Sequence, residues 1–330
     1  MSKKKLLISG GYGFIGSNFI RSIGDDYDIF VVDKRTYAAN ENHLNNINLK
    51  GDYLLDICDF GELKKVFQSI GPDKIIHFAA ESHVDRSIAN PEEFINTNIY
   101  GTYNMLRCAL EIYDSKLEDN KKDFFQFIHI STDEVFGSLK SSDKAFTEES
   151  TYKPNSPYSA SKAASDHLVR SYNKTFDLPT TILNCSNNFG QNQYHEKLIP
   201  LTIKNALNGK EIPIYGNGEQ IRDWLYVKDF CNAIKMVIDL NISNERFNIG
   251  SNNEIRNIDL VIQICSILDE IRPRKDKKSY SQQIKFVEDR KGHDIRYAIN
   301  SNKIKKSLNW KPKYNFEDSL KETIAFYANS

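Results

Sequence analysis

A glycine-rich segment near the start constrains this chain more than any other feature. The apolar run KLLIS, residues 5–9, predicts a buried strand, and the segment GGYGFIGS follows it directly. Gly10, Gly13 and Gly16 form a GxxGxxG spacing. In that spacing the first glycine permits a tight turn, the second lets the backbone approach a pyrophosphate, and the third lets helix and strand pack closely. Between a strand and a helix, the motif predicts a dinucleotide site rather than a plain turn with a helix cap.

The next predicted strand ends on a carboxylate. The run DIFVVD, residues 28–33, closes with Asp33, seventeen positions after Gly16. A carboxylate at this place accepts hydrogen bonds from the adenosine ribose and repels a 2′-phosphate, so NAD is preferred to NADP. Lys34 and Arg35 weaken that preference, because a neighbouring cation could neutralise a phosphate.

Short apolar runs alternate with helical patterns through the first half. Further strands are expected at residues 52–57, 74–80, 124–131 and 180–185, with helices near 61–71, 100–113 and 157–176. Such alternation predicts the α/β class, with a Rossmann-like, doubly wound parallel sheet covered on both faces. After Asn187 the pattern becomes irregular. We therefore expect an NAD-binding domain with the catalytic residues at 1–187, and at 188–330 a smaller mixed lobe that mainly binds substrate, with some chain returning to the sheet.

Composition excludes several classes of function. Lys plus Arg and Asp plus Glu each number 44, and this balance argues against a nucleic-acid binder. The five cysteines show no CxxC spacing and the seven histidines no HExxH pair, which predicts reduced thiols and no metal site. The apolar stretch at the start is too short for a signal peptide, and no segment has membrane-spanning length. We expect a cytoplasmic protein with no membrane partner.

A tyrosine and a lysine are spaced for one helix face. The segment SPYSASK places Tyr158 and Lys162 four residues apart on a predicted helix. A free phenol has a pKa of about 10, too high for a base at neutral pH. A nearby ammonium and a positively charged nicotinamide ring would lower that pKa, so Tyr158 could take a proton from a hydroxyl while hydride leaves the same carbon. The alternative is an ordinary exposed pair at this spacing.

Two adjacent carboxylates follow the strand predicted at 124–131. In STDEVFG, Asp133 and Glu134 lie where strands of an α/β sheet end and ligands bind. Two close carboxylates tend to hold one proton between them, which supplies one acid and one base. The alternative is a pair that only caps a loop.

Several motifs together carry a family resemblance over essentially the whole chain. GGYGFIG and YSASK resemble the extended short-chain dehydrogenase/reductase superfamily. More narrowly, AAESHVDRSI, STDEVFG, NCSNNFG, PIYGNGEQIRDWLYV and DRKGHDIRYAI resemble, in this order, the dTDP-glucose 4,6-dehydratase family. Phe136 and Phe189 stand where that family usually has Tyr, and Lys291 stands where it usually has Pro.

The resemblance implies an NAD-dependent lyase that forms dTDP-4-keto-6-deoxyglucose and water in deoxysugar biosynthesis of the rhamnose type. Tyr158 would take the C4 hydroxyl proton during oxidation, assisted by Lys162 and by a hydrogen bond from Thr132 to the sugar oxygen. Glu134 would then remove the C5 proton and Asp133 would protonate the departing C6 hydroxyl, before hydride returns to C6. General acid–base help of this kind contributes about 10²–10⁴-fold per group.

The resemblance also implies binding residues. The cofactor set adds neighbours of the glycine loop and of the strand ends: Gly10, Gly13, Phe14, Ile15, Gly16, Asp33, Lys34, Arg35, Thr36, Asp56, Ile57, Phe78, Ala79, Ala80, Ser82, Thr97, Tyr158, Lys162 and Asn188. The substrate set comes mainly from the second half: Ser82, Thr132, Asn187, Lys197, Leu198, Pro213, Ile214, Tyr215, Arg222, Asn257, Asp289, Arg290 and His293. Arg222 suits a diphosphate, since a guanidinium can bond two oxygens at once.

Three alternatives stay open at this point. A UDP-glucose 4,6-dehydratase or other nucleotide-sugar dehydratase would share most of these motifs, and a 4-epimerase of this fold would not need Asp133 and Glu134. A dinucleotide-sensing regulator without activity could use the same fold. The resemblance implies a homodimer formed through the helices that carry Tyr103 and Tyr158.

Overall fold

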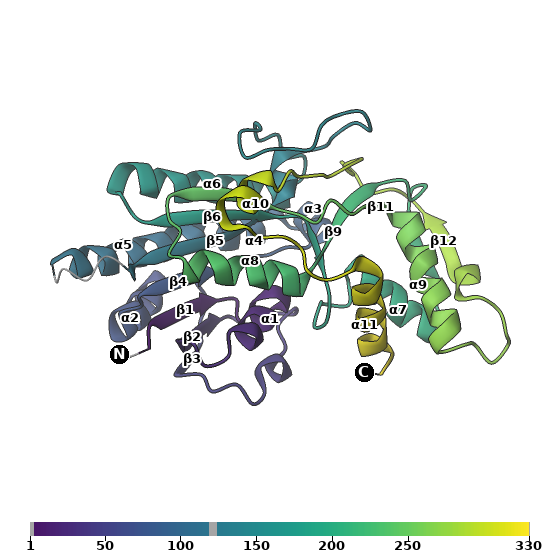
Figure 1. Ribbon diagram of the computed structural model, residues 1–330, viewed down its shortest axis with the longest axis horizontal. Coiled ribbons are helices and arrows are strands. Elements are labelled where there is room, and N and C mark those ends of the chain that lie inside the picture. Colours follow the sequence, from purple (N-terminus) through teal and green to yellow (C-terminus); the bar gives the residue numbers. More distant parts are fainter. Residues whose placement is uncertain (1–2, 119–123, 330) are drawn as a thin grey trace.

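The centre of the molecule is a seven-stranded parallel sheet (Figure 1). The computed structural model describes residues 3–118 and 124–329. The strand order is β10-β6-β5-β4-β1-β2-β3, and each neighbouring pair runs parallel. The strands are β1 (Lys5–Ser9), β2 (Asp28–Asp33), β3 (Gly51–Leu54), β4 (Lys74–His77), β5 (Gln126–Thr132), β6 (Thr180–Cys185) and β10 (Glu245–Ile249). This arrangement confirms the predicted Rossmann-like α/β fold.

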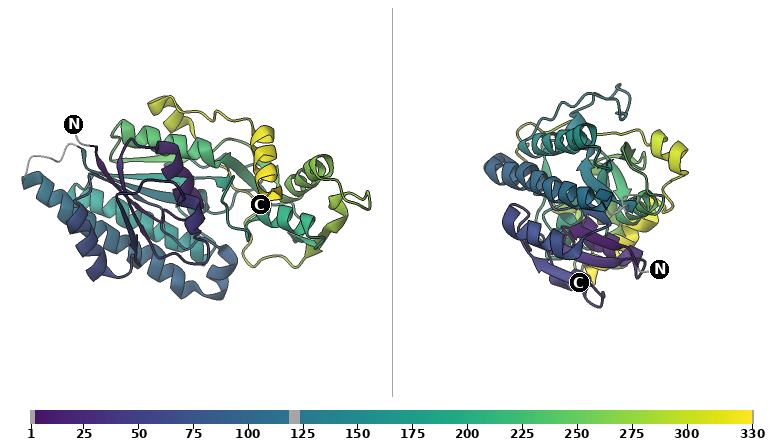
Figure 2. Two further views of the ribbon diagram at one scale, coloured as in Figure 1. Left: turned by 90° about the horizontal axis from the view of Figure 1, so that it is seen from below. Right: turned by 90° about the vertical axis from the view of Figure 1, so that its left-hand side faces the viewer.

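Helices cover both faces of the sheet because its strands are apolar on both sides. In β1, Leu6 and Ile8 point into one core and Leu7 points into the other. The first core is closed by α1 (Phe14–Ile23) and α8 (Val227–Asp239). The second is closed by α2 (Phe60–Ile70), α5 (Thr102–Glu118) and α6 (Pro157–Phe176) (Figure 2).

The strand order reverses between β1 and β4, and two loops meet at this point. The chain winds outward from β1 to β2 and β3, then crosses back to place β4 on the other side of β1. Crevices at such a reversal, outside the carboxyl ends of the strands, are where α/β sheets bind ligands. Gly10 has a φ of +74°, and a Cβ there would lie 2.5 Å from the backbone nitrogen of Ala79. The glycine loop and the end of β4 therefore pack backbone against backbone.

The second half forms a smaller lobe with two sheets of its own. One sheet joins β7 (Asn187–Phe189), β9 (Ile221–Tyr226) and β11 (Glu254–Arg256), and the other joins β8 (Ile212–Tyr215) and β12 (Ile284–Val287). The first is mixed, since β7 runs parallel and β11 antiparallel to β9. The lobe's larger helices are α7 (Leu198–Leu207), α9 (Asn257–Ile271) and α11 (Phe316–Ala328), which lie to the right of the main sheet in Figure 1. The domain boundary after residue 187 stays a prediction.

Shorter helices complete the fold. α3 (Val84–Ala89) and α4 (Pro91–Phe94) follow β4, and a π-helical turn (Ile95–Gly101) leads into α5. α10 (Asn302–Leu308) packs beside β10.

Two predicted strands end earlier than expected. Residues 55–57 and 78–80 lie outside β3 and β4. The backbone N–H groups of Phe78 and Ala79 both reach the carbonyl of Ser9, at 3.0 and 3.1 Å, so the ladder stops there. Asp56 turns the chain instead, because its carboxylate accepts a hydrogen bond from the N–H of Cys58 at 2.9 Å.

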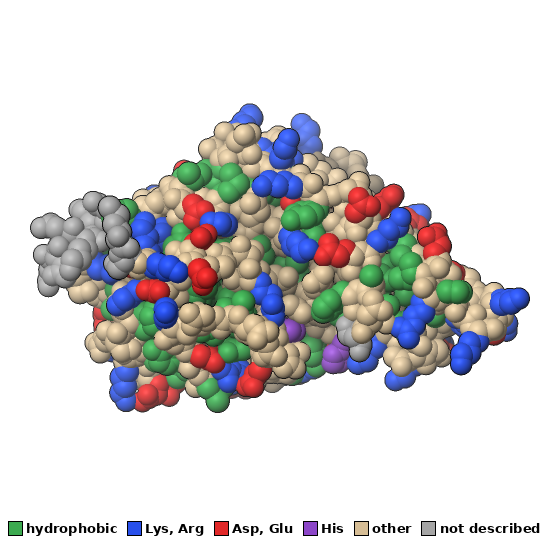
Figure 3. All heavy atoms as spheres, turned by 60° about the horizontal axis from the view of Figure 1, so that its bottom comes forward, with side chains coloured by type: hydrophobic (Ala, Val, Ile, Leu, Met, Phe, Trp, Pro, Cys, Tyr) green, Lys and Arg blue, Asp and Glu red, His purple; other side chains and the backbone are tan. Residues whose placement is uncertain are grey.

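The surface mixes charges of both signs. On the face drawn in Figure 3, Lys and Arg side chains are interspersed with Asp and Glu, as a formal net charge of zero suggests. Across residues 3–118 and 124–329, no helix combines the length and apolar character needed to cross a membrane.

The contact between Gly10 and Ala79 can be tested against a matched glycine. We expect Gly10→Ala to lower the free energy of unfolding by about 1–3 kcal/mol more than Gly24→Ala, because only the first places its methyl against backbone atoms. Both positions have positive φ, +74° and +52°, but nothing lies within 4 Å of a Cβ at Gly24. Urea unfolding followed by circular dichroism would measure the difference. Equal losses would show that the close approach is unimportant.

Candidate active site

A cavity of about 790 Å³ lies between the carboxyl ends of the central strands and the smaller lobe. Most predicted site residues line it: Gly10, Gly13, Phe14, Ile15, Gly16, Phe78, Ala80, Ser82, Thr132, Asp133, Glu134, Tyr158, Lys162, Asn187, Asn188, Lys197, Leu198, Pro213, Ile214, Tyr215, Arg222, Asn257, Arg290 and His293. The cavity wall does not include Asp33, Lys34, Arg35, Thr36, Asp56, Ile57, Ala79, Thr97 or Asp289. The predicted catalytic and substrate residues are thus brought together, apart from Asp289, while several cofactor residues lie outside this wall.

The glycine loop fits the pyrophosphate of a dinucleotide. Gly13 caps α1 without any side-chain hydrogen bond, so the first N–H groups of the helix are left for an anion. A Cβ on Gly16 would lie 2.3 Å from the carbonyl oxygen of Gly10, which leaves glycine as the residue that fits. Among the described residues, the buried side-chain oxygens of Asn187 and Asn188 have no hydrogen-bond partner. These free backbone and amide groups suit NAD.

Asp33 is held at the end of β2 by backbone donors. Its carboxylate accepts hydrogen bonds from the N–H of Tyr12 at 2.9 Å and the N–H of Arg35 at 2.7 Å. Burial raises the pKa of Asp33, and these two bonds oppose that rise. The carboxylate is therefore fixed beside the glycine loop, as the predicted ribose contact requires.

The two cations beside Asp33 already have carboxylate partners. The Arg35 guanidinium binds Glu41 at 2.8 Å and Asp52 at 2.5 Å. Lys34 pairs with Asp56 at 2.8 Å. A 2′-phosphate would have to compete with these carboxylates, so their presence favours NAD over NADP.

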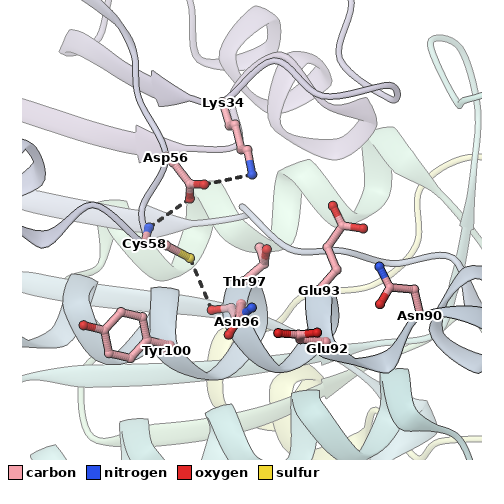
Figure 4. A pocket seen from close by; sticks show the side chains of 9 residues that line it. All are labelled: Lys34, Asp56, Cys58, Asn90, Glu92, Glu93, Asn96, Thr97 and Tyr100. Carbon is pink, nitrogen blue, oxygen red and sulfur yellow. Dashed lines mark hydrogen bonds and ion pairs between the residues drawn. The ribbon is translucent and has the colours of Figure 1, made fainter.

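Three predicted cofactor residues line a second hollow of about 420 Å³. Lys34, Asp56 and Thr97 lie in its wall, with acidic side chains of α4 across from Lys34 (Figure 4). Cys58 closes one side, where its thiol donates to the carbonyl of Asn96 at 3.3 Å. The remaining predicted residues are placed otherwise: Ile57 is in the core, Ala79 bonds β1, and Thr36 accepts a hydrogen bond from Ala39.

The start of α6 is built to hold Tyr158 and Lys162 in the cavity wall. Ser156 and Ser159 form a reciprocal capping box, with N–H to hydroxyl distances of 3.0 and 3.1 Å. One turn separates Tyr158 from Lys162, and both are buried, at 8% and 4% exposure. The Lys162 ammonium donates to the carbonyl of Ile130 at 2.8 Å.

The expected lowering of the Tyr158 pKa includes the effect of a bound nicotinamide ring and stays a prediction. In the chain by itself the pKa shifts the other way. Burial raises that pKa well above its usual value, and the nearby Glu134 adds to the rise. A hydrogen bond with Thr132 acts in the other direction but is outweighed. Lys162 loses part of its own charge to burial, which lowers its pKa to about 8. The phenol is therefore neutral here, because burial penalises the charged phenolate.

A tight turn at the end of β5 presents the acid pair. Thr132 caps this turn: its hydroxyl accepts from the N–H of Glu134 at 3.2 Å and donates to the carboxylate of Asp133 at 3.3 Å. Gly137, with a φ of +86°, ends the turn. Asp133 is 2% exposed, and among the described residues its second oxygen has no partner.

The two carboxyl groups have different electrostatic surroundings. Burial raises the pKa of Asp133 well above its usual range, and Glu134 and Asp223 raise it further. Burial also raises the pKa of Glu134, but Arg222 and Lys197 face that carboxylate and oppose the rise. Environments that push two carboxyl pKa values apart are how enzymes obtain an acid and a base from one residue type.

Basic side chains of the lobe face Glu134 across the cavity. Lys197 donates to the carbonyl of Ser82 at 2.7 Å. Arg222 is 7% exposed, donates to the carbonyl of Asp294 at 3.0 Å, and lies 4.3 Å over the ring of Tyr297. A guanidinium fixed in this way can present its remaining N–H groups to a diphosphate.

The DRKGH loop is tied down by ion pairs. The fork of Arg290 grips the carboxylate of Asp85, with one N–O distance of 2.7 Å, and its guanidinium lies 5.0 Å over the ring of Tyr215. His293 is bound through Nδ1 to Asp289 at 2.7 Å. Asp289 lies outside the cavity wall and binds His293, and its predicted contact with substrate stays a prediction.

Sequence reasoning missed a set of contacts that we call the inter-lobe clasp, formed by residues Ser82–Arg86 after β4. The clasp reaches the lobe at four points: Ser82 with Lys197, His83 with Glu196 at 3.6 Å, Asp85 with Arg290, and Arg86 with Glu196 at 2.6 and 3.1 Å. Cavity-lining residues beyond the prediction include Tyr37, Tyr194, Trp224 and Tyr297. The motif SHVDR was visible in the sequence, but partners up to 205 positions apart were not.

Known proteins are similar to this chain in sequence and in fold. The family described as GDP-mannose 4,6 dehydratase matches residues 7–323. A dTDP-glucose 4,6-dehydratase of Salmonella typhimurium is 50% identical over 98% of this chain and 92% of its own. The solved dTDP-glucose 4,6-dehydratase of Streptomyces venezuelae, with NAD bound, is 37% identical with a TM-score of 0.87, covering 99% and 97% of the two chains. A UDP-glucose 4-epimerase of Thermotoga maritima reaches a TM-score of 0.85 at 26% identity, covering 98% and 99%.

Asp133→Asn should stabilise the protein at neutral pH. The raised pKa of Asp133 means that, above the unfolded value of 3.8, the folded chain retains a proton that the unfolded chain has lost. Stability therefore falls as pH rises until the folded pKa is passed. Asparagine escapes this loss, so the melting temperature of the variant should match wild type near pH 4 and exceed it by a growing margin toward pH 8. A variant less stable than wild type at pH 8 would contradict the buried-acid assignment.

Proposed function

The chain belongs to the dTDP-glucose 4,6-dehydratase family, and we propose how its own residues divide the proton transfers of that reaction. The reaction converts dTDP-glucose to dTDP-4-keto-6-deoxyglucose and water. Bound NAD supplies the acceptor for the hydride that leaves C4 and the donor that returns it to C6. The chain must then move protons at C4, C5 and C6 without water competing for them.

Tyr158 is the group proposed to take the C4 hydroxyl proton. Its position in the cavity wall and its hydrogen bond with Thr132 support this role. Thr132 can donate to the sugar oxygen, since its hydroxyl lies between Tyr158 and the acid pair. Lys162 lines the same cavity and is proposed to supply positive charge to the phenol, from an ammonium that the carbonyl of Ile130 holds in place.

Glu134 is proposed as the base at C5 and Asp133 as the acid at C6. Oxidation at C4 makes the C5 hydrogen acidic, so a carboxylate can remove it. Asp133 is almost without exposure and has one unpartnered oxygen, so it keeps its proton until a leaving hydroxyl accepts it. Glu134 faces Arg222 and Lys197, which favour its ionised form. Burial raises both pKa values, but neighbouring carboxylates add to the rise at Asp133 while Arg222 and Lys197 oppose it at Glu134. These unequal surroundings are the observation that carries the proposal.

The same two cations also suit the diphosphate of the nucleotide sugar. Arg222 and Lys197 line the cavity opposite the acid pair, and His293 lines it nearby. Leu198 and the stretch Pro213–Tyr215 offer an apolar wall and an aromatic face for the thymine ring. In the described part of the chain the buried side-chain oxygen of Asn257 has no partner, which leaves it available to a ligand.

A 4-epimerase could have this fold, but its reaction would not require Asp133 and Glu134. A 4-epimerase reaction moves hydride and one hydroxyl proton at C4 and eliminates nothing. A buried Asp133 beside a half-buried Glu134 would destabilise such a site without serving its reaction. These two carboxyl groups favour the dehydratase over both the epimerase and the regulator without activity.

Glu134→Gln and Tyr158→Phe should stop the reaction at different steps. We expect Glu134→Gln to oxidise C4 but fail to eliminate water, because the amide cannot accept the C5 proton. Tyr158→Phe should fail before oxidation. Stopped-flow absorbance of the reduced cofactor in a single turnover with dTDP-glucose would show it accumulating in the first variant and absent in the second. If both variants block the same step, the division of labour is wrong.

We also propose a homodimer formed through α5 and α6. These neighbouring helices leave Tyr103, Leu110, Leu168 and Tyr172 only half-buried, and Phe176 is 48% exposed. Sedimentation of the purified chain should give twice the mass of one chain, and Leu168→Glu should shift it toward the monomer. Ile262→Glu, at a 47% exposed position on α9, is the matched control and should leave the dimer intact. A monomeric wild-type chain would sink the proposal.

A cytoplasmic location is proposed on the state of the cysteines. All five are free, and four of them are buried. Free thiols in this number suit a reducing compartment. Cell fractionation would check the location, and recovery outside the cytoplasm would contradict it.

A further inference from the structure

The stripe of α6 that carries Tyr158 and Lys162 continues to a third polar residue. Asp166 follows Lys162 by four positions, so the three side chains occupy one face of the helix. Asp166 is 0% exposed. A carboxylate taken fully out of water is costly unless it is paired and hydrogen-bonded, and none of the proton transfers above uses this one.

Two hydrogen bonds fix the outer oxygen of Asp166. The hydroxyl of Tyr152 donates to it at 2.6 Å, and the side-chain amide of Asn184 donates at 3.1 Å. The same amide group donates to the carbonyl of Thr132, also at 3.1 Å. Asp166 is thereby tied to the strand end that carries the acid pair.

The inner oxygen of Asp166 faces His129, a buried residue of β5. The Nε2 atom of His129 lies 3.3 Å from this oxygen and 3.3 Å from the Nζ of Lys162. Burial lowers the pKa of His129 to about 4, so its ring is neutral at neutral pH. One ring nitrogen therefore lies 3.3 Å from both the lysine amine and the carboxylate, and in a neutral ring it can hydrogen-bond only one of them at a time.

Asp166 is the ionised partner among the groups that face Lys162. Those groups come from four elements: Tyr158 and Asp166 on α6, His129 on β5, Cys185 on β6 and His77 on β4. Burial raises the pKa of the Tyr158 phenol and the Cys185 thiol, and it lowers the pKa of both histidines, so these four are neutral at pH 7. Asp166 has a lowered pKa despite its burial, because His129, Lys162 and Tyr152 favour its charged form.

We infer that Asp166 is a positioning residue whose nearby charge keeps Lys162 charged and in place on the face of α6 that also carries Tyr158. The inference rests on the proposed function for Lys162, and it extends the Tyr–Lys pair to a Tyr–Lys–Asp stripe on α6. Through Asn184, the same carboxylate also fixes the backbone of Thr132. One buried charge thus sets the placement of both halves of the proton-transfer machinery.

Asp166→Asn should lower the pKa of Lys162 by about one unit or more, because the amide keeps the shape but removes the countercharge. The apo protein labelled with ε-13C lysine would report the titration by NMR. The Lys162 signal is assigned by its loss in Lys162→Met. Lys74 provides an internal control. Burial lowers its pKa to about 8 as well, but its amine binds the side chains of Gln126 and Asn241 rather than the groups around Asp166. An unmoved Lys162 midpoint, or equal movement of both lysines, would overturn the inference.

The pH profile of the enzyme gives a second readout. In Asp166→Asn the alkaline limb of kcat/KM should move to lower pH by the same amount as the Lys162 midpoint, while Asp166→Glu should largely restore it. Asp229→Asn is the matched control, since Asp229 is also buried and accepts from the N–H of Lys313 at 2.7 Å. This variant should leave the alkaline limb of kcat/KM where it is in the wild type. If Asp166→Glu and Asp166→Asn shift the alkaline limb of kcat/KM equally, Asp166 acts only by packing and the inference fails.

A double-mutant cycle keeps the test usable if Asp166→Asn alone does not fold. Removing one member of a buried charge pair leaves the other uncompensated. The double variant Lys162→Met with Asp166→Asn should therefore be more stable than the sum of the two single losses predicts, and it should fold even if the single amide variant does not. Additive losses would overturn the inference. Neither this cycle nor the NMR titration uses substrate. Failure of the proposed function would be seen in a different experiment, as the absence of product when the enzyme is incubated with dTDP-glucose.

Discussion

The whole site depends on burying ionisable groups where water cannot solvate their charges. Burial is the largest influence on the pKa of Asp133, Glu134, Tyr158 and Lys162. It raises the pKa of the first three and lowers that of Lys162, and in each case this favours the neutral form of the side chain. Specific side chains, rather than solvent, interact with each of these groups. Cations face Glu134, a threonine hydroxyl bonds Asp133, and a buried carboxylate stands behind Lys162. Differences between neighbours, rather than charge itself, give each group its separate role.

The parallel sheet makes such burial possible. Parallel strands covered on both faces bring their carboxyl ends to one edge, beneath loops that the helices hold in place. The turn after β5 and the start of α6 meet at this edge, and β7 begins two residues after β6. The smaller lobe then closes the edge from outside and supplies the cations. Neither half of the chain holds a complete site without the other.

Local spacing explains what the sequence could predict. Three predictions depend on neighbours within about twenty positions: the glycine loop, Asp33 and the Tyr158–Lys162 pair. The glycine loop and the pair line the cavity as expected, whereas Asp33 lies outside the cavity wall. The role of Asp166 needed a histidine from another strand, and the grip of Arg290 on Asp85 needed residues 205 positions apart. The rise of the Tyr158 pKa in the chain by itself was not predicted, for a related reason. Pairing with Lys162 can be imagined from spacing, but the extent of burial comes from tertiary packing.

The inter-lobe clasp connects the glycine-loop side of the cavity to the side lined by the smaller lobe. It follows β4, whose end packs against the glycine loop at Gly10, and it binds the lobe through Lys197, Glu196 and Arg290. One short segment therefore joins the two sides. If a bound dinucleotide changes the affinity for the sugar by some factor, the sugar must change the affinity for the dinucleotide by the same factor. A weakened clasp would show up as lost cooperativity between two ligands, even where each still binds alone.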